Sequence, residues 1–157
     1  MQTLNVVVKS LKAMKKALFI LMMLLLLGIV FSYAQCGKKQ IITASKTEYL
    51  DASGNVQRTV DESTTIEYND SLIVITTGAE GQEMRGPVKS ITCGWKTAYK
   101  EGKTVIKAPI VDPRGDVKNL TITIEGKEGK LVLLAEAEER PERKIRIVID
   151  KFEEKSN

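Results

Sequence analysis

The sequence VKNLTITIE, residues 117–125, is the stretch that best predicts the fold of this chain. From Asn119 onwards, polar and apolar side chains alternate without interruption. Successive side chains of a β-strand point to opposite faces, so this stretch predicts a strand with one apolar face and one polar face. The apolar face consists of Leu120, Ile122 and Ile124, and the polar face consists of Asn119, Thr121, Thr123 and Glu125.

Turn signals on both sides of this strand predict hairpins. Asp112-Pro113-Arg114-Gly115 precedes it and Gly126-Lys127-Glu128-Gly129 follows it, and proline and glycine favour tight turns. Alternation, β-branched residues and flanking turns predict further strands elsewhere in the chain. These expected strands lie at residues 40–50, 56–60, 64–68, 72–76, 88–99, 104–110, 131–138 and 144–150, with a glycine-rich loop at residues 78–86.

The expected elements are about eight to ten short strands separated by turns, and no segment favours a helix. This spacing indicates an all-β fold, either an antiparallel barrel or a two-sheet sandwich. The connections are short enough for hairpins, which favours an up-and-down meander, and closure of the meander would remove its exposed edges. We therefore expect a small antiparallel meander that closes into a barrel, with the β-sandwich as the alternative.

Residues 14–35, MKKALFILMMLLLLGIVFSYAQ, have the features of a secretory signal peptide. Lys15 and Lys16 form a positive start, an apolar run follows, and Ser32 and Ala34 supply the small residues of a cleavage site. We expect a signal peptide at residues 1–34, with Met14 as an alternative start, and a single β domain at residues 35–157 whose tail frays from about residue 153. The protein would then be secreted or located in the periplasm or cell envelope, with the membrane contacted only through the signal segment.

Two alternatives to cleavage remain open. The apolar run could serve as an uncleaved anchor, although it is shorter than the roughly 20 residues of a usual spanning helix. Cys36 could instead carry a lipid, although Gln35 and Tyr33 differ from the small residue and the leucine that lipid attachment favours.

The net charge of the chain belongs to the leader. Lys9, Lys12, Lys15 and Lys16 are the only charged residues before Gln35, so 24 − 4 = 20 basic residues face 20 acidic residues in the remainder. A balanced charge gives no reason to expect nucleic acid as a partner. The two cysteines, Cys36 and Cys93, predict one disulfide in an oxidising compartment, and the alternative is a buried Cys93 with a free Cys36.

The chemistry of the chain favours binding over catalysis. It contains no histidine, which excludes Ser-His-Asp and Cys-His catalysis and histidine zinc sites, and no phosphate-binding or dinucleotide motif is present. We expect no enzyme activity, no metal and no cofactor. A cluster of three glutamates could form the acid pair of a glycosidase-like enzyme or a calcium site only if the fold brought it near Asp112 or Glu142. A solvent-exposed strand end is the better explanation of this cluster. The clustered residues are Glu136, Glu138 and Glu139.

The hairpin spacing over residues 40–150, together with Trp95, resembles small secreted lipocalin-like (calycin) domains, which are meandering barrels of similar length. The Gly-x-Trp signature of that family belongs to the first strand, whereas here Gly94 directly precedes Trp95 in mid-chain.

Two hypotheses of function follow. The first is a secreted or envelope binding module that holds an apolar or amphipathic ligand inside the barrel, because the inward faces are aliphatic. The second is a structural or protein-interaction module of the cell envelope that takes no small-molecule ligand and binds an envelope protein by strand addition at an open β edge. The candidate ligand-binding residues of the first hypothesis, each of which could equally be plain core, are Trp95, Ile122, Leu133 and Ile147.

Overall fold

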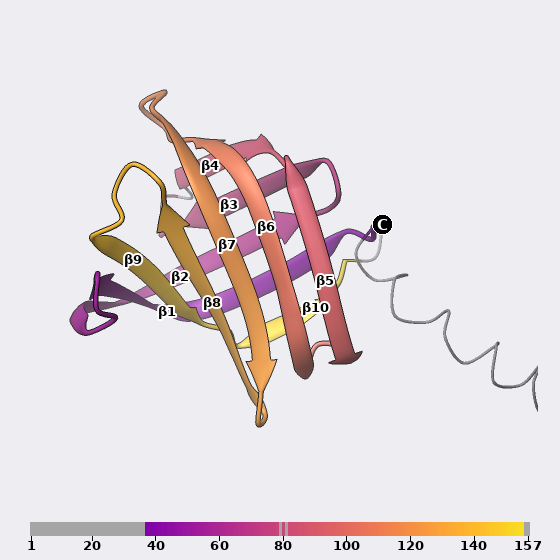
Figure 1. Ribbon diagram of the computed structural model, residues 1–157. Coiled ribbons are helices and arrows are strands. Elements are labelled where there is room, and N and C mark those ends of the chain that lie inside the picture. The colour runs from indigo at the N-terminus through magenta and orange to yellow at the C-terminus, as the bar shows by residue number, and fades with distance from the viewer. Residues whose placement is uncertain (1–36, 79, 81, 156–157) are drawn as a thin grey trace, which may run out of the picture. The chain divides into compact units, whose positions relative to one another are not determined.

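The computed structural model describes residues 37–78, 80 and 82–155, which form ten strands (Figure 1). None of the described residues belongs to a helix that is long and apolar enough to span a membrane. The strands are β1 (Gln40–Asp51), β2 (Val56–Tyr68), β3 (Leu72–Thr77), β4 (Gln82–Pro87), β5 (Ser90–Thr97), β6 (Glu101–Val111), β7 (Val117–Lys127), β8 (Lys130–Ala137), β9 (Arg143–Val148) and β10 (Lys151–Glu154).

Eight strands form a closed antiparallel barrel. Neighbours in the ring follow the order β1-β2-β3-β4-β6-β7-β8-β9, and β9 pairs back onto β1. Every pairing is antiparallel, and successive strands of the ring are joined by short turns or by β5. The all-β class and the closed meander expected from the sequence are therefore confirmed, and the barrel is compatible with a lipocalin-like architecture.

The two strands outside the ring each extend a neighbour. β1 pairs with β9 over its second half and with β10 over its first half, so β9 and β10 follow one another along the same side of β1 with a break near Ile149. In the same way β6 pairs with β5 over its first half, and its ladder with β4 contains the single pair Arg85 and Val111. The barrel thus opens at the ends of β1 and β6, where β5 and β10 diverge from the ring.

The core consists of the inward residues of this barrel. The two-residue period of the strands places isoleucine at alternate positions. Ten side chains, seven aliphatic and three polar, are less than 2% exposed. Ile122 on β7 and Leu133 on β8 are 0% and 1% exposed. The core cluster contains Ile42, Ala44, Ile66, Tyr68, Ile73, Ile75, Ile106, Ala108, Ile110, Ile122, Ile124, Leu133, Ile147, Ile149 and Phe152.

Aromatic side chains close the open end between β5 and β10. The ring of Phe152 meets that of Tyr99 edge to face with centroids 4.7 Å apart, and meets that of Trp95 at 5.6 Å. Tyr68 lies on a third side, 6.4 Å from Phe152. The Trp95 indole N–H donates a 2.7 Å hydrogen bond to the hydroxyl of Thr104. These contacts stabilise the end of the barrel that backbone pairing leaves open.

The prediction of a break between residues 60 and 64 was wrong, because β2 is continuous from Val56 to Tyr68. The irregularity is a bulge in β2 itself, since Ala44 pairs with Thr64 and Lys46 pairs with Asp61, which leaves two residues of β2 opposite one residue of β1. Asp61 stands opposite Lys46, and both are exposed. The charged segment is therefore accommodated as a β-bulge that bends β2 locally without ending the strand.

The prediction of a loop throughout residues 78–86 was also wrong, because Gln82–Pro87 form β4. All six residues of β4 pair with β3, from Gln82 opposite Thr77 to Pro87 opposite Leu72. Gly86 had suggested a loop, but it is buried where β4 crosses β6 and leaves no room for a side chain there.

The C-terminal residues, expected to fray from about residue 153, pair with β1 through Glu154. Glu67 accepts ion pairs from Lys39, at 3.0 Å, and from Lys155, which tie the end of the described chain to β2. The predicted signal peptide at residues 1–34 lies outside the described residues. Cys36, the predicted disulfide partner of Cys93, lies outside them as well, so the disulfide stays a prediction.

Candidate functional site

The four candidate ligand-binding residues lie in or against the packed core. Leu133 on β8 stands opposite Ile147 on β9, and Ile122 on β7 lies one inward position away from this row. All three residues belong to the core cluster. Trp95 packs against this cluster from β5, among the aromatic side chains at the open end. The structure therefore brings the first three together and keeps Trp95 at one end of the barrel.

The hollow beside Trp95 is very small. Gln40, Tyr68 and Phe152 are among the residues that line it, and its volume is about 10 Å³. That space holds roughly one water molecule, whereas small-molecule sites usually measure about 300–1,000 Å³. A ligand at this position would have to displace Trp95 or Phe152.

Backbone pairing points to a different feature, the free edge of β5. Among the described residues, β5 pairs with β6 alone, from Ser90 opposite Lys107 to Thr97 opposite Glu101. Figure 1 shows β5 at the margin of the front strands, with no labelled strand beside its outer edge. The outward residues Ser90, Thr92 and Gly94 are exposed, and Lys96 is the only charged residue of the strand. One side of this eight-residue strand thus has no pairing strand among the described residues, and such an edge can accept a further strand.

Two other edges of the barrel carry charged side chains, which discourage pairing with another strand. β10 has four residues, and Lys151 and Glu153 form an ion pair on it at 2.7 Å. The first half of β2, residues 56–63, pairs with β1 but lies beyond the reach of β3. That half carries Arg58, Asp61 and Glu62. Short length and charged side chains discourage strand addition, so β5 is the least protected of the three edges.

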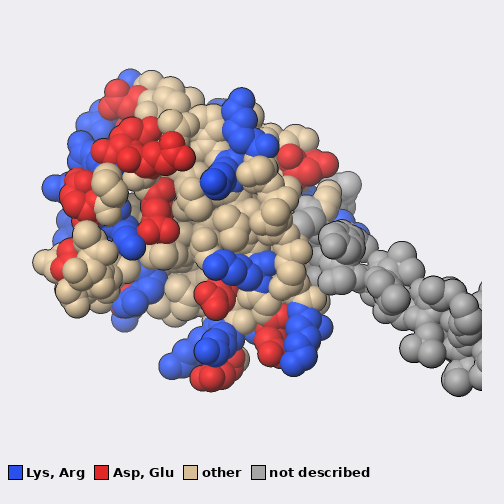
Figure 2. Space-filling view, in the orientation of Figure 1, with Lys and Arg blue, Asp and Glu red and all other residues tan. Residues whose placement is uncertain are grey.

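The outer face next to β5 is poor in charge. Strand register aligns Thr92, Val105, Thr123 and Leu134 in one outward row across β5, β6, β7 and β8. Figure 2 shows uncharged residues over most of the surface that these front strands present, with isolated Lys, Arg, Asp and Glu groups among them. The free edge and this face therefore form one continuous surface.

The carboxylates grouped in the sequence analysis do not form a shared site. Glu136 pairs with Lys144 at 3.0 Å, and Glu139 accepts hydrogen bonds from the backbone N–H and side-chain amide of Asn119 at 2.9 and 3.0 Å. The Asn119 backbone N–H holds the pKa of Glu139 below its usual value. No group of three or more His, Cys, Asp or Glu among the described residues could hold a metal ion.

Comparison of the chain with known protein families, with curated proteins and with solved structures gives no match. The candidate site therefore rests on the geometry of the chain alone. The sequence analysis named open β edges in general but missed that β5 is the exposed one. The low charge of Ser90–Thr97, compared with Lys151–Glu154 and with the start of β2, was the signal in the sequence that could have found it.

Proposed function

We propose that this chain is a protein-interaction module that binds an extended segment of a partner along the free edge of β5. The observation that carries this proposal is that, within the described part of the chain, β6 is the one strand that pairs with β5, while the outward side chains of β5 carry a single charge. In strand addition, main-chain hydrogen bonds supply affinity and alternate side chains supply specificity. The bound segment would extend the β5–β8 sheet by one strand.

The residues behind the edge support this role. Trp95 and Ile91 on β5 pack against the core, and the Trp95 side chain is fixed by its hydrogen bond to Thr104. An edge that is already rigid loses little entropy when a partner strand is added, which favours binding. The cell envelope is the proposed location, because the leader at residues 1–34 has the features of an export signal.

The alternative, an apolar or amphipathic ligand inside a lipocalin-like barrel, has weaker support. The three central candidates Ile122, Leu133 and Ile147 fill the core, and the hollow at Trp95 measures about 10 Å³. An interior ligand would require the aromatic end to open. The resemblance to lipocalin-like domains therefore concerns the architecture of the barrel, and it gives no reason to propose a bound ligand.

Site-specific photocrosslinking in the producing cells tests the strand-addition proposal. A benzophenone amino acid placed at Thr92, on the free edge, is expected to capture a discrete partner. The same amino acid at Thr121 is the matched control, because this threonine lies on the same outer face but on β7, which has a neighbour on both sides.

A second change sharpens the test. Gly94→Lys adds a charged side chain to the edge at a position where a Cβ meets no atom within 4 Å, so the barrel tolerates it. We expect Gly94→Lys to abolish the adduct formed from Thr92. Equal adducts from Thr92 and Thr121, or an adduct that Gly94→Lys leaves unchanged, would contradict the proposal.

A further inference from the structure

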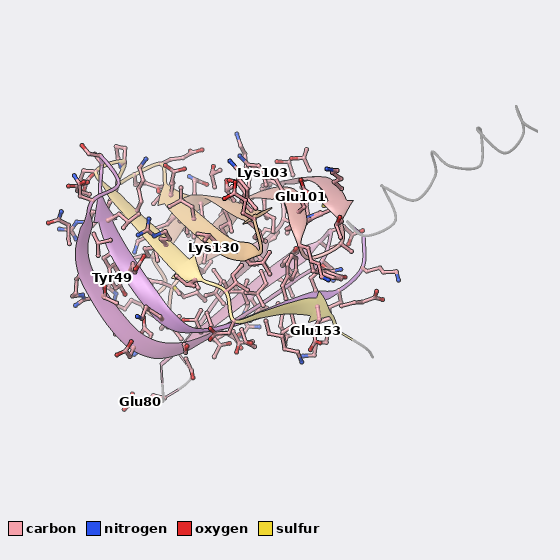
Figure 3. All side chains as sticks on the ribbon, turned by 90° about the horizontal axis from the view of Figure 1, so that it is seen from below. Tyr49, Glu80, Glu101, Lys103, Lys130 and Glu153 are labelled. Atoms are coloured by element: carbon pink, nitrogen blue, oxygen red, sulfur yellow. The ribbon has the colours of Figure 1, made fainter. Side chains whose placement is uncertain are left out.

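A groove lies at the end of β1 that is remote from the aromatic cluster. Its volume is about 550 Å³, and it is formed by the end of β1, the start of β2 and the start of β9 together with the residue before it. Figure 3 labels Tyr49 near this end of the long curved β1–β2 hairpin. The volume falls within the range of about 300–1,000 Å³ that is usual for small-molecule sites.

One wall of the groove is apolar. Tyr49, which is half-buried, and Leu50, which is buried, line the groove. Ile145 does not line it but stands opposite Tyr49 on β9, with 36% of its surface exposed. Exposed apolar surface next to a concave region can bury the hydrocarbon part of a ligand.

Arg58 is held across this wall in a fixed orientation. Its guanidinium carbon lies 4.3 Å from the centre of the Tyr49 ring, a cation–π contact that follows from the pairing of the two residues in the β1–β2 hairpin. The Arg58 side chain makes no ion pair with any described residue. A guanidinium group that stacks on an aromatic ring still has its N–H donors free in its own plane. Two of these donors can bind the two oxygens of a carboxylate.

A second arginine faces the same groove. Arg143, at the start of β9, lines it and makes no ion pair with the described residues, while the neighbouring Lys144 is paired with Glu136 at 3.0 Å. Arg143 stands opposite Asp51 in the β1–β9 ladder. Arg58 and Arg143 therefore approach the groove from strands on either side of β1.

The carboxylates of the groove only partly offset these cations. Asp51 is occupied within its own turn, where it accepts hydrogen bonds from the backbone and side chain of Asn55 at 2.9 and 3.1 Å and from Gln57 at 3.0 Å. Neither Asp51 nor Glu142, the two carboxylates that line the groove, makes an ion pair with a described residue. Three cationic residues, Arg58, Arg143 and Lys144, line the groove together with two carboxylates, so cationic side chains outnumber carboxylates in its lining.

We propose that this groove binds a small amphipathic anion, with its carboxylate between Arg58 and Arg143 and its hydrocarbon part against Tyr49. The apolar wall supplies burial of hydrocarbon, and the two arginines supply charge-assisted hydrogen bonds. This site is separate from the free edge of β5 and needs no opening of the core, so its failure would leave the strand-addition proposal intact.

Calorimetric titration of the full chain with decanoate tests the proposal, with decyltrimethylammonium as a probe of the same chain length and opposite charge. We expect saturable decanoate binding with a dissociation constant below about 1 mM. The cationic probe is expected to bind at least about tenfold more weakly, since Arg58 and Arg143 repel it.

Variants locate the binding. The double substitution Arg58→Gln and Arg143→Gln is expected to weaken decanoate binding by at least about tenfold. Arg114→Gln is the matched control, because Arg114 is an equally exposed arginine in the β6–β7 turn, where it pairs with Asp112 at 3.3 Å. Circular dichroism of each variant checks that the barrel is retained. No saturable decanoate binding, equal binding of both probes, or unchanged binding by the double variant would overturn the proposal.

Discussion

Gly86 on β4 lies directly against the backbone of Pro109 on β6: a Cβ built on Gly86 would lie 1.7 Å from the Pro109 carbonyl oxygen. The two strands share only the pair Arg85 and Val111, so the barrel closes here by close contact of backbones more than by a long ladder. Any side chain at residue 86 would push β4 away from β6.

Gly86→Ala is therefore expected to destabilise the barrel by about 3 kcal/mol, because the extra methyl group cannot be accommodated without backbone movement. Gly94→Ala is the control, since a Cβ at Gly94 meets no atom within 4 Å, and its effect should stay within about 0.5 kcal/mol. Urea unfolding of the three proteins measures the difference. A Gly86→Ala protein as stable as the wild type would show that β4 and β6 are not in contact as described.

Thr64→Val is expected to leave stability unchanged or to raise it by about 1 kcal/mol. Thr64 is buried on β2, and its hydroxyl oxygen has no hydrogen-bond partner among the described residues. Valine has the same shape without the polar group. Thr65→Val on the outer face serves as the control, and unfolding midpoints provide the measurement. A loss of more than about 1 kcal/mol in Thr64→Val would indicate that the hydroxyl binds a buried water or another group.

The ion pairs of Glu67 predict a dependence of stability on acid pH. Hydrogen bonds from Lys155 and Lys39 lower the pKa of Glu67 in the folded state. A carboxyl group with a lowered folded pKa stabilises the protein above its unfolded pKa, and this contribution disappears as the pH falls through the folded pKa. The pair is partly exposed, so we expect a contribution of about 0.5 kcal/mol near neutral pH.

Glu67→Gln should remove that contribution, so the free energy of unfolding should fall less steeply between about pH 5 and pH 3 than in the wild type. Glu125→Gln is the control, because Glu125 makes no ion pair with the described residues. Identical pH profiles for the wild type and Glu67→Gln would refute the role of Glu67.

Tyr68 predicts a second, alkaline dependence. Burial raises the pKa of its phenol well above the ordinary value near 10, although a hydrogen bond with Thr104 acts in the opposite direction. A raised folded pKa means that stability is complete below the unfolded pKa and is lost as the pH rises towards the folded pKa. Unfolding measured above about pH 10 should therefore become steadily easier.

Tyr68→Phe is expected to reduce this alkaline loss while costing about 1 kcal/mol near neutral pH through the lost hydrogen bond. Spectrophotometric titration of the wild type should show one tyrosine that ionises only when the barrel unfolds. If all the tyrosines ionise together near pH 10 in the folded protein, the burial of Tyr68 is wrong.

Some residues of the candidate sites could be predicted from the sequence. Trp95 was named from the sequence as a candidate binding residue, and the structure places it at one end of the barrel against Phe152. The pair of Tyr49 and Arg58 could have been inferred, because the two residues lie three steps on either side of the turn Ala52–Asn55. Arg143 could not be added to them, since its place depends on the closure of the barrel by β9, almost a hundred residues away from β1.

The sequence alone determined the all-β class and most of the strands, because a two-residue alternation such as that of Val117–Glu125 is a local property of the chain. The tertiary structure decided β4, the free edge of β5 and the groove at Tyr49. Each of these depends on which distant backbones meet: Gly86 reads as a loop residue until Pro109 lies against it, and β5 has an open edge only because no described strand pairs with it beyond β6. Such contacts are set by the closure of the barrel, which no local pattern of side chains encodes.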